Sequence, residues 1–185
     1  MRRTLLSNAI LGTVLIASCA LAATKESAPD PSDAVLAKSI RHQILMYANY
    51  TLWDDISFRV DNGSVELEGS VNQPYKRADL ERLVQRVPGV SAVTNQLKVL
   101  PMSPFDDRLR LQVARAIYND PSLSRYAMGA VPAIHIIVEN GRVTLTGSVS
   151  TAMDKQIASI RAASSLSFGP VVNNLTVENP PAKKS

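Results

Sequence analysis

A twelve-residue block occurs twice in this chain, 78 residues apart, and it constrains the fold more than any other feature. The first copy is VDNGSVELEGSV at residues 60–71, and the second is VENGRVTLTGSV at residues 138–149, with eight of twelve positions identical. The same offset relates Val99 to Val177, so the repeat extends beyond the block. Self-similarity at a fixed period indicates copies of one structural unit. We therefore expect two small modules with the same fold.

Each copy of the block predicts a β-hairpin. Apolar and polar residues alternate on both sides of an Asn-Gly pair, which accepts the positive φ angles of a tight two-residue turn. This places the turns at Asn62-Gly63 and Asn140-Gly141. The alternation predicts which residues of the second strand face the core. They are Val65, Leu67, Gly69 and Val71 in copy one, and Val143, Leu145, Gly147 and Val149 in copy two.

Helices are expected before and after the first hairpin, because apolar residues recur there at helical spacing. The first helix is predicted at residues 33–47, with Ser32 or Asp33 as its cap, and the second begins at Pro74. Pro88-Gly89 ends the second helix, and a third strand follows at residues 90–99.

The second copy repeats this order with small changes. A capping box at residues 103–106 opens a helix that runs through Tyr118, and the last strand is predicted at residues 171–177. Five extra residues lie between this helix and the first strand of the copy, within residues 119–133. The second helix is predicted to turn one set of residues inward, namely Met153, Ile157, Ile160 and Ser164.

The predicted fold class is therefore α+β, with two tandem α-β-β-α-β units, each a three-stranded sheet packed on two helices. The predicted domains are residues 33–100 and 106–178, joined by residues 101–105 and followed by a flexible tail at residues 179–185.

The N-terminus predicts export. Residues 1–22 have two arginines, a short apolar run and then small residues, which is typical of a signal peptide, and residues 23–32 resemble a polar tether. Two interpretations of its end stay open. Residues 16–19 resemble the bacterial lipobox, in which Cys19 would be lipidated, with Ala20 after it pointing to the outer membrane; cleavage after Ala22 would instead discard the cysteine. The expected location is the periplasm, with anchoring to the outer membrane as the lipoprotein alternative.

Net charge does not predict a nucleic-acid partner. The formal charge is +4, but residues 33–100 carry eight basic and eight acidic residues, and residues 106–179 carry seven and six. A nucleic-acid interface needs a concentrated basic face, so we expect none in either unit.

Side-chain chemistry does not predict an active site or a metal. His42 and His135 belong to no metal or triad pattern and are expected at the surface, and the folded units have no cysteine. Glu66 and Glu68 point outward on one strand, but copy two has Thr144 and Thr146 there. Asn95 and Asn173 are expected to hydrogen-bond nearby backbone. We expect no enzyme activity, no metal and no cofactor.

The combined motifs resemble the BON domain (bacterial OsmY and nodulation), in tandem, over residues 33–178. The resemblance rests on N-G-x-V-x-L-x-G-x-V in each hairpin and V-x-N-x-L-x-V in each last strand. The copies match at Asn62, Gly63, Val65, Leu67, Gly69, Val71, Val93, Asn95 and Leu97, and at Asn140, Gly141, Val143, Leu145, Gly147, Val149, Val171, Asn173 and Leu175. Copy two departs from the pattern at residues 166–168, Leu-Ser-Phe, where copy one has Pro-Gly-Val.

The resemblance implies a non-enzymatic envelope protein that binds anionic phospholipid surfaces and supports envelope integrity or tolerance of osmotic stress. The alternative is a soluble periplasmic stress chaperone, or a scaffold for other envelope proteins as partners.

The longer connection of copy two is the candidate lipid contact. There Arg125 would meet headgroups, while Tyr126 and Met128 would insert below them, although the same residues could instead close the core. The same two roles, lipid contact and core packing, are open to Tyr50 and Trp53 in copy one, and packing is the favoured role for them.

Overall fold

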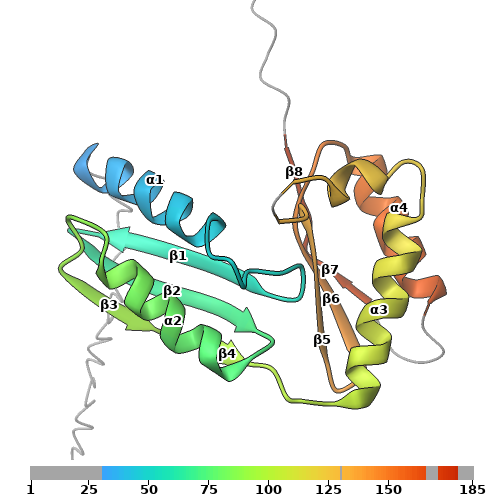
Figure 1. The fold of residues 1–185 in the computed structure, drawn as a ribbon. Coiled ribbons are helices and arrows are strands. Elements are labelled where there is room, and N and C mark those ends of the chain that lie inside the picture. The colour runs from blue at the N-terminus through green and yellow to red at the C-terminus, as the bar shows by residue number, and fades with distance from the viewer. Residues whose placement is uncertain (1–30, 130, 166–170, 179–185) are drawn as a thin grey trace, which may run out of the picture.

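The computed structural model describes residues 31–129, 131–165 and 171–178, in two domains (Figure 1). Domain 1 comprises α1 (Pro31–Leu45), β1 (Asp55–Asp61), β2 (Ser64–Val71), α2 (Pro74–Gln85), β3 (Ala92–Asn95) and β4 (Lys98–Val99). Domain 2 comprises α3 (Pro104–Tyr118), the 3₁₀ turn η1 (Ser124–Ala127), β5 (Ile134–Glu139), β6 (Arg142–Val149), α4 (Ala152–Ser164), β7 (Val171–Asn173) and β8 (Thr176–Val177). The predicted repeated α+β order is confirmed. The predictions for residues 1–30, 166–168 and 179–185 lie outside the described residues.

Both hairpins form around the predicted Asn-Gly turns. Asn62 and Gly63 have φ angles of 49° and 75°, and Asn140 and Gly141 have 51° and 75°. Such paired positive values match the twist of the flanking strands, which explains why asparagine and glycine stand at these positions. β1 and β5 therefore run antiparallel to β2 and β6, and each is an edge strand.

The third strand of each sheet is interrupted, which corrects the prediction of one continuous strand. β3 and β4 both pair parallel with β2, but residues 96 and 97 lie between them, and β7 and β8 repeat this arrangement beside β6. Asn95 explains the break, because its side-chain oxygen accepts a hydrogen bond from the backbone of Leu97 and its amide donates to the carbonyl of Arg77. Asn173 does the same in domain 2, so the predicted structural role of both asparagines is confirmed.

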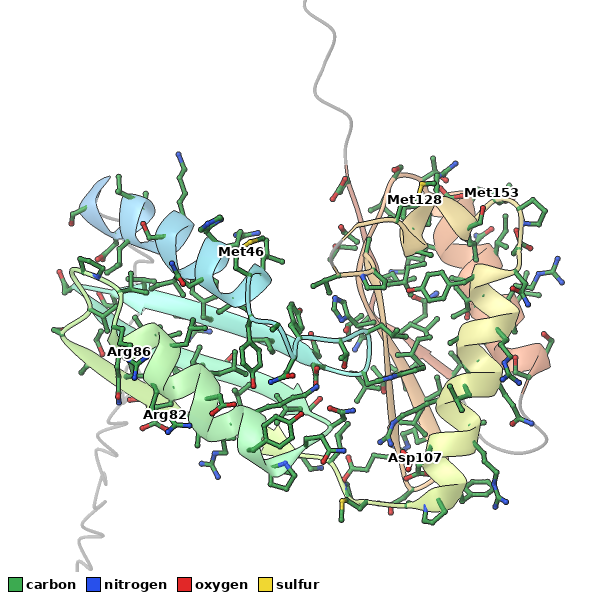
Figure 2. All side chains as sticks on the ribbon, in the orientation of Figure 1. Met46, Arg82, Arg86, Asp107, Met128 and Met153 are labelled. Carbon is green, nitrogen blue, oxygen red and sulfur yellow. The ribbon has the colours of Figure 1, made fainter. Side chains whose placement is uncertain are left out.

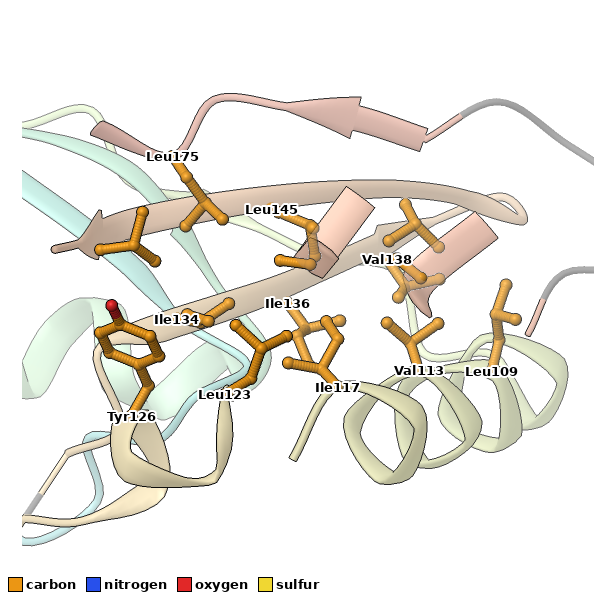
Figure 3. Close-up of a cluster of buried hydrophobic side chains, with 14 residues drawn as sticks. Leu109, Val113, Ile117, Leu123, Tyr126, Ile134, Ile136, Val138, Leu145 and Leu175 are labelled. Atoms are coloured by element: carbon orange, nitrogen blue, oxygen red, sulfur yellow. The ribbon is translucent and has the colours of Figure 1, made fainter. Parts of the chain in front are cut away.

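Each domain has its own apolar core between one face of its sheet and its two helices. In domain 2 Leu109, Val113 and Ile117 of α3 meet the core face of β5 and β6 (Figure 3). In domain 1 the core is completed by Ile40 and Leu80, which are fully buried.

The inward face of α4 differs from the prediction. Ala158 and Ala162 are buried, whereas Met153 and Ile160 are exposed. The repeat explains the correct face, because the 78-residue offset places Ala158 at the position of Leu80. The smaller alanines let α4 lie on the sheet, Ile157 packs at the margin of the core as predicted, and Met153 and Ile160 point to solvent.

An aspartate in the first turn of each leading helix holds the hairpin turn. The Asp33 carboxylate accepts hydrogen bonds from the backbone N–H groups of Asn62 (2.8 Å) and Gly63 (3.1 Å). The Asp106 carboxylate accepts them from Asn140 and Gly141, both at 2.9 Å. The predicted capping by Ser103 is also present, since its hydroxyl accepts from the Asp106 N–H. The helix start and the turn are therefore fixed together.

Candidate functional site

The loop before β1 lies at the contact between the two domains. We call residues 50–54 the docking loop, because it lies against the edge of β5 in domain 2 (Figure 1). The Ile136 N–H donates to the Leu52 carbonyl (2.8 Å), and the side chains of Leu52 and Trp53 pack on the domain 2 core. The predicted packing role of Trp53 is confirmed, although it packs on the other copy and not on its own.

His135 is buried, so the prediction of a surface histidine is wrong for this residue. Its ring stacks on Tyr50 of the docking loop, with centroids 5.5 Å apart and an interplanar angle of 16°. Burial lowers the pKa of His135, while the carboxylates of Asp55 and Asp54 oppose the shift. His42 is exposed, as predicted. In the sequence, the alternation of the strand places His135 on the outer face of the sheet. In the structure, the docking loop of domain 1 covers that position and buries the ring.

The predicted lipid-contact residues Arg125 and Tyr126 take part in an internal polar cluster. Tyr126 is only 8% exposed, and its hydroxyl donates to Asp154 (2.9 Å) and accepts from the Ser150 N–H (2.8 Å). The Arg125 guanidinium donates to Asp154 at 2.6 Å and stacks on the Tyr126 ring. The ring of Tyr126 is therefore buried, as the core-closing alternative expects for this residue, and lipid contact at this connection stays a prediction.

Hydrogen bonds within this cluster shift the pKa values of Asp154 and Arg125. Burial opposes ionisation of Asp154, but hydrogen bonds from Thr151 and Tyr126 and the charge of Arg125 outweigh it and lower the pKa of the carboxyl. The same contacts, led by the hydrogen bond to Tyr126, raise the pKa of Arg125. The positive charge of Arg125 is thus largely balanced within the domain.

Met128 is exposed to solvent, as the predicted lipid contact requires. Its side chain is 81% exposed at the end of η1, and Met153, at the start of α4, is 63% exposed (Figure 2). Both methionines are neighbours of the Arg125–Asp154 ion pair in sequence. Whether they contact lipid stays a prediction.

Domain 2 exposes large apolar side chains on α3, η1 and α4. Leu111 on α3 is 50% exposed and Ile160 on α4 is 65% exposed. We call Leu111, Met128, Met153 and Ile160 the apolar face of domain 2. The sequence pattern assigned Met153 and Ile160 to the core, so this surface was missed.

The equivalent surface of domain 1 is basic. A groove between α1 and α2 is lined by four basic side chains, which we call the basic groove: Lys38, His42, Arg82 and Arg86. Asp79 is its only acidic lining residue, and hydrogen bonds from Tyr47 and Arg82 lower the pKa of that carboxyl. Arg82 projects from α2, and Arg86 is the residue that caps its C-terminal end (Figure 2).

The repeat register relates these two surfaces residue by residue. The offset of 73 places Lys38 at Leu111, and the offset of 78 places Arg82 at Ile160. At these two positions domain 1 has a basic residue and domain 2 a large apolar one, which a comparison of exposed positions between the copies could have detected.

Other chemistry is sparse among the described residues. They contain no group of three or more His, Cys, Asp or Glu side chains arranged to hold a metal ion. No helix in the described part of the chain is long and apolar enough to cross a membrane. Glu66 pairs with Arg59 and Gln96 on the outer face of the sheet, away from any groove with a second carboxylate.

Comparison with known proteins identifies a domain family. Residues 32–101 and residues 105–179 each match the family model described as BON domain. Curated proteins yield no match. Among solved structures, CdsD, a structural protein of the Type III secretion system of Chlamydia trachomatis, is 13% identical with a TM-score of 0.28, covering 78% of this chain and 94% of that one. The C-terminal domain of CdsD is 14% identical with the same TM-score, covering 78% and 98%. A TM-score this low carries no argument.

Proposed function

The chain belongs to the BON domain family, as two tandem domains, and from this premise we propose that it is a non-enzymatic cell-envelope protein that binds anionic phospholipid surfaces. The observation that carries the proposal is the difference between the two helix pairs. Domain 2 presents its apolar face, and domain 1 presents its basic groove.

The apolar face supplies the contact energy. Four large apolar side chains exposed at the surface of one small domain are costly in water and gain free energy when they enter the boundary between headgroups and acyl chains. Each large side chain that is fully buried contributes about 1.5–3 kcal/mol. Partial insertion of two or three of them is enough for reversible binding.

The basic groove supplies the preference for anionic lipid. Basic side chains near an anionic surface each contribute about 1 kcal/mol, and the effect is screened by salt. Arg125 contributes less than the sequence predicts, because Asp154 already balances its charge, and Arg82 is likewise partly balanced by its ion pair with Asp79. A lipidated Cys19, if present, would hold both surfaces near the membrane at high effective concentration.

Co-sedimentation with vesicles tests the proposal. The protein from residue 23 to 185, which has no anchor, is mixed with neutral and with anionic vesicles at two salt concentrations. We expect binding to anionic vesicles that weakens at high salt. Replacement of Arg82 and Arg86 by Gln should remove the preference for anionic lipid, whereas Arg108→Gln, an exposed arginine on α3, serves as the matched control.

The apolar contribution is tested separately. Met153→Ser with Ile160→Ser should weaken vesicle binding about tenfold or more, from the lost apolar area. Met102→Ser, which removes a still more exposed apolar side chain from the joint between the domains, should leave it unchanged. Absence of binding to either vesicle would overturn the proposal and favour the alternative, a soluble stress chaperone or scaffold.

A further inference from the structure

The free edge of β5 in domain 2 is covered by three hydrogen bonds from outside the sheet. The Tyr118 hydroxyl donates to the Ile134 carbonyl (2.5 Å), and Arg110 donates to the Val138 carbonyl (2.8 Å). Between them, the Ile136 N–H donates to Leu52 of the docking loop. The three strand residues are 0% exposed. The edge of domain 2 is therefore closed.

The matching edge of β1 in domain 1 has none of these partners. The positions of Tyr118 and Arg110 are taken by Leu45 and Ala37, which cannot donate a side-chain hydrogen bond. Within residues 31–129, 131–165 and 171–178, nothing hydrogen-bonds to the outward-facing backbone groups of Ile56, Phe58 and Val60. These three residues are also only half-buried, whereas their counterparts in domain 2 are fully buried.

A groove runs along this open edge. It lies between α1 and β1, and it is lined by Arg41, Ile44, Leu45, Tyr50, Ile56, Ser57 and Phe58. In domain 2 Leu52 and Trp53 pack against the core at this edge, and so do Ala114 and Tyr118, the counterparts of Arg41 and Leu45. The sister domain thus shows that such an edge accepts a backbone carbonyl and large apolar side chains, there supplied by the turn at Leu52 and Trp53.

We propose that β1 is a dimerisation edge, at which β1 of a second copy of this chain pairs antiparallel with it. An open strand edge is a template for pairing with another chain. A two-fold axis lets one contact cover both open edges and then closes, so the assembly stops at two copies.

Side-chain complementarity selects the register centred on Ser57, the middle of the strand segment that lines the groove. Ile56 then lies opposite Phe58 of the second copy, a pair that exchanges two backbone hydrogen bonds and occurs twice about the axis. On the outer face Asp55 lies opposite Arg59 of the second copy, also twice. A register centred on Phe58, which moves every pairing by two residues, would instead place Asp55 opposite Asp61. Opposite charges across strands stabilise pairing, and like charges weaken it.

The first test copies the caps of domain 2 into domain 1. The protein from residue 23 to 185 is studied by sedimentation velocity over a range of concentrations, and we expect a monomer–dimer equilibrium. Leu45→Tyr with Ala37→Arg should place a hydroxyl on the Ile56 carbonyl and a guanidinium on the Val60 carbonyl, as in domain 2. Leu45 is exposed and Ala37 is half-buried on α1, so circular dichroism and the melting temperature should stay nearly unchanged while the dimer is lost. Met102→Ser is the control that leaves the edge open.

The second test is a charge exchange. Arg59→Asp would place like charges opposite each other and should raise the dimer dissociation constant about tenfold or more. Asp55→Arg combined with Arg59→Asp should restore it. A protein that stays monomeric at all concentrations overturns the proposal, and so does a dimer that persists in the capped variant. Neither result depends on lipid binding.

Discussion

The Lys76 ammonium lies 2.6 Å from the Asp54 carboxylate, and the two side chains are only 3% and 0% exposed. Asp54 also accepts hydrogen bonds from the backbone N–H groups of Thr51 and Asn72, both at 2.9 Å. This pair therefore joins the docking loop to the first turn of α2 and to the end of β2. It anchors, from inside domain 1, the loop that contacts domain 2.

Domain 2 has an equivalent ion pair between loop and helix, but with the charges reversed. The repeat offset places Asp154 at the position of Lys76, and its partner Arg125 comes from the preceding connection. The Ser150 N–H, the counterpart of the Asn72 N–H, donates to Tyr126. Arg125 and Tyr126 therefore bond the connection before β5 to the start of α4 within domain 2. This structural role accounts for both residues.

We expect Lys76→Met to destabilise domain 1 by about 3–5 kcal/mol, because it leaves the buried Asp54 charge unpaired. Lys98→Met is the matched control. It removes an ammonium that lies at the same distance, 2.6 Å, from Glu139, but this pair is exposed to solvent. An exposed pair contributes about 1 kcal/mol or less. Urea unfolding followed by circular dichroism measures both, and equal losses would contradict the importance of burial.

Asp154 should make domain 2 sensitive to acid. Its pKa is lowered in the folded protein, so the stability it contributes is present above its unfolded value, about 3.9, and is lost as pH falls through the folded value. Asp154→Asn should lower stability at pH 7 and flatten the decline below pH 4. The free energy of unfolding measured between pH 7 and pH 2 checks this. A variant whose acid decline matches that of the wild type would contradict the assignment.

Local sequence patterns were sufficient for the hairpins but not for the helix faces. Asn-Gly and strict alternation act within a few residues, so the turns and the buried residues such as Val65 could be predicted. The face of α4 could not, because the large residues Met153 and Ile160 resemble a core stripe, whereas the actual contacts use Ala158 and Ala162. Aligning α4 with α2 by the repeat would have resolved this.

Gly147→Ala tests the close contact at the start of β5. A Cβ at Gly147 would lie 2.1 Å from the Ala133 carbonyl oxygen, and the φ angle is +105°. We expect a loss of more than about 4 kcal/mol in stability, because the atom in the way belongs to the backbone. Gly129→Ala has a similar φ angle, +116°, but its nearest atom would be 3.6 Å away. Strain alone should cost it about 1–3 kcal/mol. Thermal unfolding separates the two, and similar losses would show that backbone strain, not contact, decides.

The domain interface could not be predicted, since it depends on residues distant in sequence. Nothing near Trp53 or His135 indicates that the docking loop of one copy covers the strand edge of the other. The two edges also differ through single residues, Tyr118 against Leu45, which the shared motif does not include.

His135 should make this interface sensitive to mild acid. Its pKa is lowered by burial, so the unfolded state binds the proton more readily, and stability falls as pH drops through the unfolded value of about 6.5. Trp53 is the only tryptophan of the chain and lies in the interface, so its fluorescence reports on docking directly. We expect its emission to shift to longer wavelength between pH 7 and pH 5, as protonation of His135 weakens the contact with Tyr50. His135→Gln should remove the shift, whereas His42→Gln, an exposed histidine on α1, should not. A shift that survives His135→Gln would assign the acid response to another group.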